Sequence, residues 1–160
     1  MQKFHPNDFY DDDFELIAIH SSLEDFRLAY FINQKLPVLL SKCKEPIGLT
    51  TKNTEVFFSK FIFEDEANDA QWYLFANMVE AVSTIENNTQ DLFLDSKLEI
   101  EETFFLLPEF KKVDYFLKIE NNLSITGLPD IVKRLNSIER ISAVYTVDHD
   151  KIKSKNNLIF

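Results

Sequence analysis

Cysteine and glycine are scarce in this chain of 160 residues, which has one cysteine and two glycines. The lone Cys43 cannot form a disulfide within the chain, and a zinc site built from cysteines is excluded. Gly48 and Gly127 lie too far apart to build the glycine-rich loops of dinucleotide-binding or P-loop proteins. The motifs of zinc metalloproteases and serine hydrolases are absent as well. We therefore expect no cofactor, no metal and none of these familiar activities.

Positive charge is also limited, because 17 Lys and Arg stand against 27 Asp and Glu, for a net charge of −10 at pH 7. Nucleic acids and anionic membranes attract basic proteins, so this balance argues against both as partners. Residues 111–160 are the exception, with 9 basic and 6 acidic side chains. The weakest of three functional hypotheses is therefore a contact with RNA or the ribosome through Lys111, Lys112, Lys133, Arg134 and Arg140.

Long hydrophobic runs are missing too. No stretch approaches the roughly 20 apolar residues that a membrane-spanning helix needs. Residues 1–13 lack the apolar run of a secretory signal and end in three aspartates, which we interpret as a solvated acidic arm rather than a metal site. Together with the single cysteine, these features predict a cytoplasmic protein.

What the sequence does contain is the pattern of one α+β domain over residues 1–160. Residues 14–20, FELIAIH, carry apolar side chains on both faces, as in a central strand that is covered on each side. A helix is expected over residues 23–36, because Pro37 disfavours the helical conformation of the residue before it. Residues 38–53 are interpreted as an irregular connection.

The middle of the chain predicts further strands. Residues 54–63 form one long expected strand, and residues 71–78 form its hairpin partner. The acidic stretch between them, residues 64–69, is expected to be the turn. Residues 80–98 fit either a strand or a helical turn followed by a loop, and residues 99–107 predict another strand.

The last third gives the clearest pattern, a strand over residues 113–120, a helix over 127–138 and a strand over 140–148. Residues 149–160 form a C-terminal tail. Together with the earlier elements, this order predicts an α+β sandwich with about six strands in a mixed or antiparallel sheet. The two main helices are expected on one face of that sheet, as in an elaborated ferredoxin-like fold.

The first helix has more apolar residues than one face can bury. One broad face is expected to pack on the sheet and consists of Leu23, Phe26, Ala29, Tyr30, Ile32 and Leu36. Leu28 and Phe31 fall on the opposite side and need a cover of their own. Two covers are considered. The first is a loop or terminal segment of the same chain, for example the C-terminal residues Leu158, Ile159 and Phe160. The second is a dimer or a partner protein, which would make Leu28 and Phe31 candidate interface residues.

Residues 107–115, LPEFKKVDY, hold the densest group of polar and aromatic residues. This stretch resembles the signature of the IPExxxVDY family, small proteins of Bacteroidota that are named for this motif and have no assigned activity. Five of its six named positions match, and Leu107 replaces the isoleucine. The resemblance implies a bacterial protein and supplies no reaction, cofactor or catalytic residue.

The residues of this motif have a structural interpretation. Pro108 should end one strand, Glu109 should lie in a short helical turn, and Asp114 should accept backbone hydrogen bonds. Tyr115 should bury its ring and find a partner for its hydroxyl. The alternative interpretation makes Glu109, Asp114 and Tyr115 a candidate binding site at one strand junction.

These observations lead to two main hypotheses. The first is a non-enzymatic protein that binds another protein or itself, because catalytic motifs are absent and the first helix has a surplus of apolar residues. The second is a small-molecule sensor or an enzyme of unfamiliar kind, with a pocket near Glu109, Asp114 and Tyr115.

Overall fold

The structure is a computed structural model that describes residues 14–51, 54–85, 98–120 and 127–160. The acidic arm and most of the ambiguous stretch predicted between residues 80 and 98 lie outside the described residues.

A six-stranded antiparallel sheet forms the centre of the fold, with the strand order β10-β1-β9-β6-β5-β2. These strands are β1 (Phe14–Ser21), β2 (Ser41–Lys42), β5 (Lys60–Asp65), β6 (Ala70–Ala76), β9 (Tyr115–Glu120) and β10 (Ile141–Thr146). The four strands β10-β1-β9-β6, with one helix after β1 and one after β9, repeat the split β-α-β order of a ferredoxin-like sheet. The predicted α+β fold is confirmed, and β5 and β2 are its extension.

Strand β1 lies inside the sheet because its sequence suits burial on both sides. Its middle residues, Leu16, Ile17, Ala18 and Ile19, have no exposed surface. Ile17 and Ile19 belong to the hydrophobic cluster on one face, and Leu16 and Ala18 belong to the cluster on the other. This confirms the two-sided apolar strand expected from FELIAIH.

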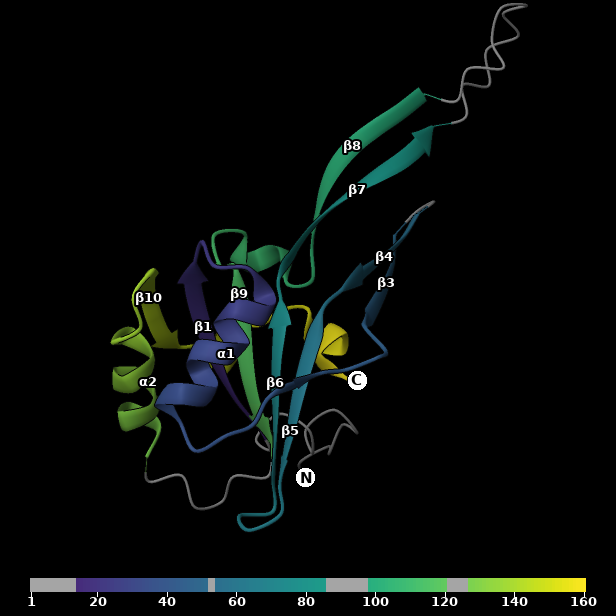
Figure 1. Cartoon of the computed structure of the whole chain (residues 1–160). Helices are drawn as coiled ribbons and strands as arrows, with labels where there is room; N and C mark the ends of the chain where they lie inside the picture. Colours follow the sequence, from purple (N-terminus) through teal and green to yellow (C-terminus); the bar gives the residue numbers. More distant parts are fainter. Residues whose placement is uncertain (1–13, 52–53, 86–97, 121–126) are drawn as a thin grey trace, which may run out of the picture.

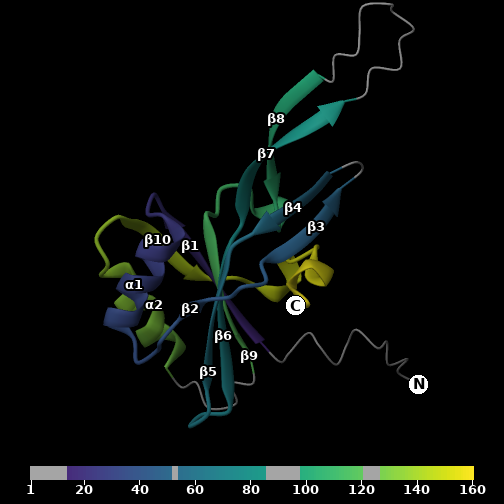
Figure 2. The same ribbon diagram turned by 45° about the vertical axis from the view of Figure 1, so that its right-hand side comes forward.

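Both main helices, α1 (Asp25–Lys35) and α2 (Leu128–Asn136), cover the same face of the sheet, as Figure 2 shows with the sheet nearly edge-on. Helix α1 packs through Leu28, Ala29 and Ile32. It ends two residues before Pro37, in agreement with the conformational limit that a proline imposes on its predecessor. In α2, Pro129 occupies the first turn, where its missing N–H has no helical partner to lose.

The C-terminal segment covers the opposite face of the sheet (Figure 2). It contains two 3-10 turns, η3 (His149–Lys151) and η4 (Lys155–Leu158), and Leu158 is almost fully buried in the second cluster. The prediction that this tail covers Leu28 and Phe31 is therefore wrong, because the two lie on opposite faces of the sheet.

One buried cation holds this tail in place. The Lys118 side chain is only 5% exposed, and its Nζ donates to the Leu158 carbonyl oxygen at 2.6 Å and pairs with Glu120 at 2.6 Å. The same Nζ lies 4.8 Å from the centroid of the Phe160 ring and 5.2 Å from that of Phe14. A buried ammonium needs such partners, because an unpaired charge in the core is strongly unfavourable.

Two small sheets extend from the central one. The first pairs β3 (Ile47–Thr51) with β4 (Thr54–Phe58), and the second pairs β7 (Met78–Ile85) with β8 (Leu98–Phe105), which projects as an arm in Figure 1.

Two sequence predictions are wrong in this region. The single strand expected over residues 54–63 is divided at Ser59 into β4 and β5, which belong to different sheets. The connection expected to be irregular over residues 38–53 contains β2 and β3. The hairpin of β5 and β6 around the acidic turn is confirmed.

None of the helices in the described part of the chain combines the length and the apolar character needed to cross a bilayer.

Candidate functional site

The connection between β8 and β9 contains the LPEFKKVDY motif and is organised by one residue from elsewhere, Asn77. Asn77 lies between β6 and β7, at the base of the projecting arm, and is fully buried. Its side-chain Nδ2 donates to the carbonyl oxygens of Phe110 (2.8 Å) and Val113 (3.0 Å), and its Oδ1 accepts from the N–H of Leu107 (2.8 Å). Its own backbone N–H donates to the Asp114 carbonyl at 2.9 Å. Asn77 is therefore hydrogen-bonded to the motif from its beginning to its end.

Within the motif, Pro108–Phe110 form the expected helical turn, η2. Glu109 Oε2 accepts hydrogen bonds from the backbone N–H of Ser154 (3.1 Å) and from its hydroxyl (2.9 Å). This contact joins the motif to the C-terminal segment.

The next two polar residues of the motif hold the chain between β1 and α1. Asp114 Oδ2 accepts from the N–H of Ser21 at 2.8 Å, and the Tyr115 hydroxyl donates to the Leu23 carbonyl at 2.7 Å. Burial, followed by the nearby carboxylates of Asp25 and Asp114, raises the pKa of Tyr115 to about 12. The hydroxyl therefore keeps its proton and its role as a donor at ordinary pH.

Glu109, Asp114 and Tyr115 thus do not converge on one space. Glu109 bonds to the C-terminal segment, whereas Asp114 and Tyr115 bond to the β1–α1 connection. Each of the three side chains has a hydrogen-bond partner within the chain, which agrees with the structural interpretation of the motif. The second carboxylate oxygen of Glu109, Oε1, is buried without a partner among the described residues.

The two candidate interface residues of α1, Leu28 and Phe31, differ in their exposure to solvent. Leu28 has no exposed surface and packs in the hydrophobic core beneath the helix, so it offers nothing to a partner in this conformation. Phe31 is 36% exposed. Two residues expected on the buried face, Phe26 and Tyr30, are 56% and 58% exposed. The surplus of apolar side chains exists, but it consists of Phe26, Tyr30 and Phe31.

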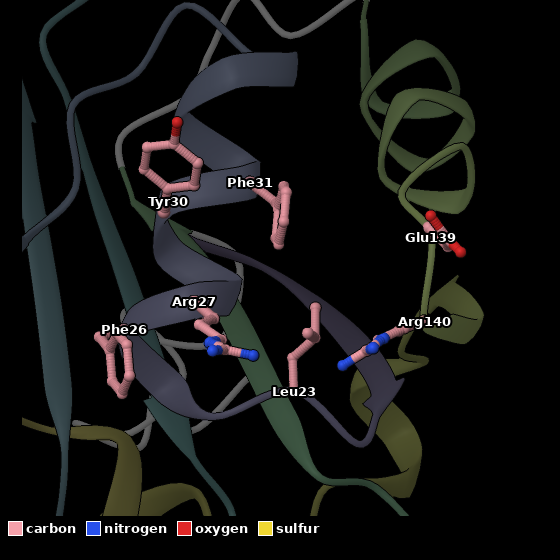
Figure 3. A pocket seen from close by; sticks show the side chains of 7 residues that line it. All are labelled: Leu23, Phe26, Arg27, Tyr30, Phe31, Glu139 and Arg140. Atoms are coloured by element: carbon pink, nitrogen blue, oxygen red, sulfur yellow. The ribbon is translucent and has the colours of Figure 1, made fainter.

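These aromatic residues border a hollow between α1 and the turn that joins α2 to β10 (Figure 3). Its volume is about 660 Å³. We call it the α1 hollow; it is lined by Leu23, Phe26, Arg27, Tyr30, Phe31, Glu139 and Arg140.

The pairing of β1 with β10 builds this hollow. Ser21 lies opposite Ile141 in the sheet, which places the turn before β10 beside the start of α1. The Ser21 hydroxyl donates to the Arg140 carbonyl at 2.9 Å, and Arg140 has a positive φ of 69°. A residue with a side chain seldom adopts this conformation, so the surrounding structure must impose it.

The two arginines of the hollow point toward each other across Leu23 (Figure 3). Neither guanidinium group has an ion pair or a hydrogen bond to the rest of the described chain, whereas Arg134 on α2 pairs with Asp130 at 2.9 Å. The carboxylate of Glu139 stands higher on the wall, toward α2, and is also outside any ion pair with described residues (Figure 3). The α1 hollow therefore carries a local excess of positive charge on an acidic protein.

The histidines of the described chain do not form a joint site. His20 Nε2 lies 2.9 Å from the Tyr145 hydroxyl at one end of β1, and the His149 ring packs 4.8 Å from the Phe14 ring at the other end. Within the described ranges, no group of three or more histidine, cysteine, aspartate or glutamate residues is placed to hold a metal ion.

Sequence reasoning did not single out Asn77, Arg27 or Lys118. Asn77 stands between two strand patterns in the sequence FANMV, where a turn-forming residue interrupts an otherwise strand-like run. That interruption was an available signal. Nothing in the local sequence distinguishes Arg27 from any other exposed helical arginine. Its position beside the hollow depends on Arg140, which is distant in the sequence.

Comparison of the chain with models of protein families, with curated proteins and with solved structures found no match in any of the three.

Proposed function

We propose that this chain is a non-enzymatic binding module that docks a protein partner, or a second copy of itself, at the α1 hollow. The observation that carries the proposal is the exposure of Phe26, Tyr30 and Phe31 on one helix, next to Arg27 and Arg140.

The chemistry of this surface is that of a protein interface. Aromatic residues and arginine are enriched at the centre of such interfaces, and they supply most of the affinity where they are buried. Burying one large apolar side chain stabilises a complex by about 1.5–3 kcal/mol before the costs of association. Three aromatic side chains on one helix are therefore a sufficient nucleus for a contact.

The alternative of a small-molecule sensor or an enzyme with a pocket near Glu109, Asp114 and Tyr115 has less support. Asp114, the Tyr115 hydroxyl and Oε2 of Glu109 are engaged in hydrogen bonds within the chain, and Oε1 of Glu109 is buried. Contact with RNA also has less support, because Arg134 is paired with Asp130 and the chain carries a net charge of −10.

Membership of the IPExxxVDY family, a bacterial origin and a cytoplasmic location are proposals that rest on the sequence alone. They are supported by the five matching motif positions and by the single cysteine.

The proposal is tested with two variants of the hollow, Phe31→Asp and Phe26→Asp. Size-exclusion chromatography with light scattering measures self-association, and affinity capture from the native host identifies retained proteins. We expect wild-type protein either to form a dimer or to retain a defined partner, and both variants to lose it.

Phe57→Asp is the matched control. Phe57 is 52% exposed and belongs to β4, a strand that lies away from α1 in both views of the fold (Figures 1 and 2). The variant therefore makes the same chemical change on a different element. The proposal fails if wild type is a monomer that retains no protein, or if Phe57→Asp has the same effect as Phe31→Asp.

A further inference from the structure

We infer that the partner at the α1 hollow presents an acidic segment, in which a carboxylate binds between Arg27 and Arg140 and neighbouring apolar side chains pack on the aromatic residues of α1. This inference rests on the proposed function and specifies the chemistry of the partner.

Arg27 and Arg140 carry positive charges that have no counterion among the described residues. Both guanidinium groups face the same space, and neither is neutralised by a described residue of the chain (Figure 3). Guanidinium binds carboxylate through two parallel N–H···O bonds, and such charge-assisted bonds are stronger than neutral ones. A carboxylate between the two groups would balance the positive charge that remains beyond the single carboxylate of Glu139.

The apolar side chains of α1 lie on both flanks of the helix. Figure 3 shows Phe31 on the flank of α1 that faces the arginine pair, whereas Phe26 and Tyr30 stand on the flank farther from Arg140. The Tyr30 and Phe31 rings pack edge to face with centroids 5.5 Å apart. The apolar surface thus continues around the helix beyond the arginines. A peptide segment can cover both parts, whereas a small anion would leave Phe26 and Tyr30 exposed.

The charge of the whole chain limits the partner further. A long polyanion such as nucleic acid would meet two arginines and then a protein with a net charge of −10. A symmetric contact between two copies brings the same set of lining residues together, and in that set two arginines stand against the single carboxylate of Glu139. A short acidic segment is attracted by the two arginines. It is too short to reach the negatively charged remainder of the surface.

The experiment uses a phage-displayed library of random dodecapeptides, selected on the full-length protein. Binding of the selected peptides is measured by fluorescence anisotropy against wild type and against the double variant Arg27→Gln/Arg140→Gln. We expect peptides enriched in Asp or Glu next to apolar residues, and affinity about ten-fold or more lower for the double variant. Affinity for wild type should also fall as salt is raised.

Lys111→Gln/Lys112→Gln is the matched control, because it removes the same charge from two exposed residues that do not line the hollow. We expect this variant to bind the selected peptides as tightly as wild type does. An equal loss in both double variants would show a general effect of net charge and would overturn the inference.

The library also separates this inference from the proposed function. Peptides without acidic enrichment whose binding is lost in Phe31→Asp would keep the hollow as a docking site and overturn the acidic partner. Selection of no peptide that depends on Phe31 would overturn both. If light scattering shows that the chain forms a dimer through the hollow and no acidic peptide is selected, a second copy of the chain replaces the acidic partner.

Discussion

The LPEFKKVDY connection and the α1 hollow both concentrate polar and aromatic residues, but they use them differently. In the connection, Glu109, Asp114 and Tyr115 each form a hydrogen bond with another part of the chain. The buried side chain of Asn77 bonds to the backbone of the same connection. In the hollow, Arg27 and Arg140 face the solvent without partners among the described residues. Satisfied polar groups stabilise a fold, whereas groups left unsatisfied beside exposed aromatic rings are free to bind another molecule. The most distinctive sequence motif is therefore the less promising place to look for function.

The largest effect on stability is expected for Asn77→Ala. This change leaves the Leu107 N–H and the Val113 carbonyl oxygen without their hydrogen-bond partner, and it removes one of the two bonds to the Phe110 carbonyl, which keeps the bond from the Val113 N–H. Each unsatisfied group costs about 1–3 kcal/mol, so urea denaturation should show a loss of about 3 kcal/mol or more. Asn136→Ala, at an exposed helix end with one long bond of 3.4 Å, should change stability by less than about 0.5 kcal/mol. Similar losses in the two variants would remove the special role of Asn77.

The second comparison replaces two cationic residues by methionine: Lys118, which has partners in the core, and Arg27, which has none among the described residues. Lys118→Met removes the bonds to Leu158 and Glu120, and we expect a loss of about 2 kcal/mol together with faster hydrogen exchange in η4. Arg27→Met removes no side-chain hydrogen bond or ion pair within the described chain and should leave stability within about 0.5 kcal/mol of wild type. A larger loss for Arg27→Met than for Lys118→Met would reverse the contrast between the two regions.

A smaller effect, of about 1 kcal/mol, is expected for Tyr115→Phe, which loses the hydrogen bond to Leu23. The pKa of Tyr115 is about 12 in the folded protein, above its usual value of 10.0. Between these values the unfolded chain loses its proton and the folded chain keeps it, so the contribution is complete below pH 10 and is lost as pH rises toward 12.

Denaturation curves measured from neutral to alkaline pH check this prediction. The free energy of unfolding should decline less steeply in Tyr115→Phe than in wild type over that window. Parallel declines in the two proteins would assign the alkaline loss to other groups.

The smallest effect is expected for Arg140→Gly, and it has the opposite sign. Arg140 has a φ of 69°, which glycine adopts without strain, so the substitution should stabilise the protein by about 1 kcal/mol or less. The same variant should bind an acidic peptide less tightly, because it removes one guanidinium group. A gain of stability with a loss of binding would show that the arginine is kept for its partner, and unchanged binding would contradict its role in the hollow.

The sequence predicted the regular elements of the last third well, because the alternation of β9 and β10 and the helical spacing of α2 are local patterns. It failed at residues 54–63, where a strand-like stretch without Gly or Pro gives no turn signal at Ser59, the point at which the chain changes sheet. It also failed to orient α1. With apolar residues on every side of that helix, periodicity alone does not decide which face is buried, and contact with the sheet selected Leu28 rather than Phe26.

The sequence by itself determined the α+β class, the two-sided burial of β1 and the helical turn after Pro108, because each follows from local spacing and conformational preference. The α1 hollow was decided only by the tertiary structure. Antiparallel pairing of β1 with β10 sets Ser21 opposite Ile141 and so brings Arg140 beside the helix that carries Arg27. That contact joins distant parts of the chain, and no pattern within either segment encodes it.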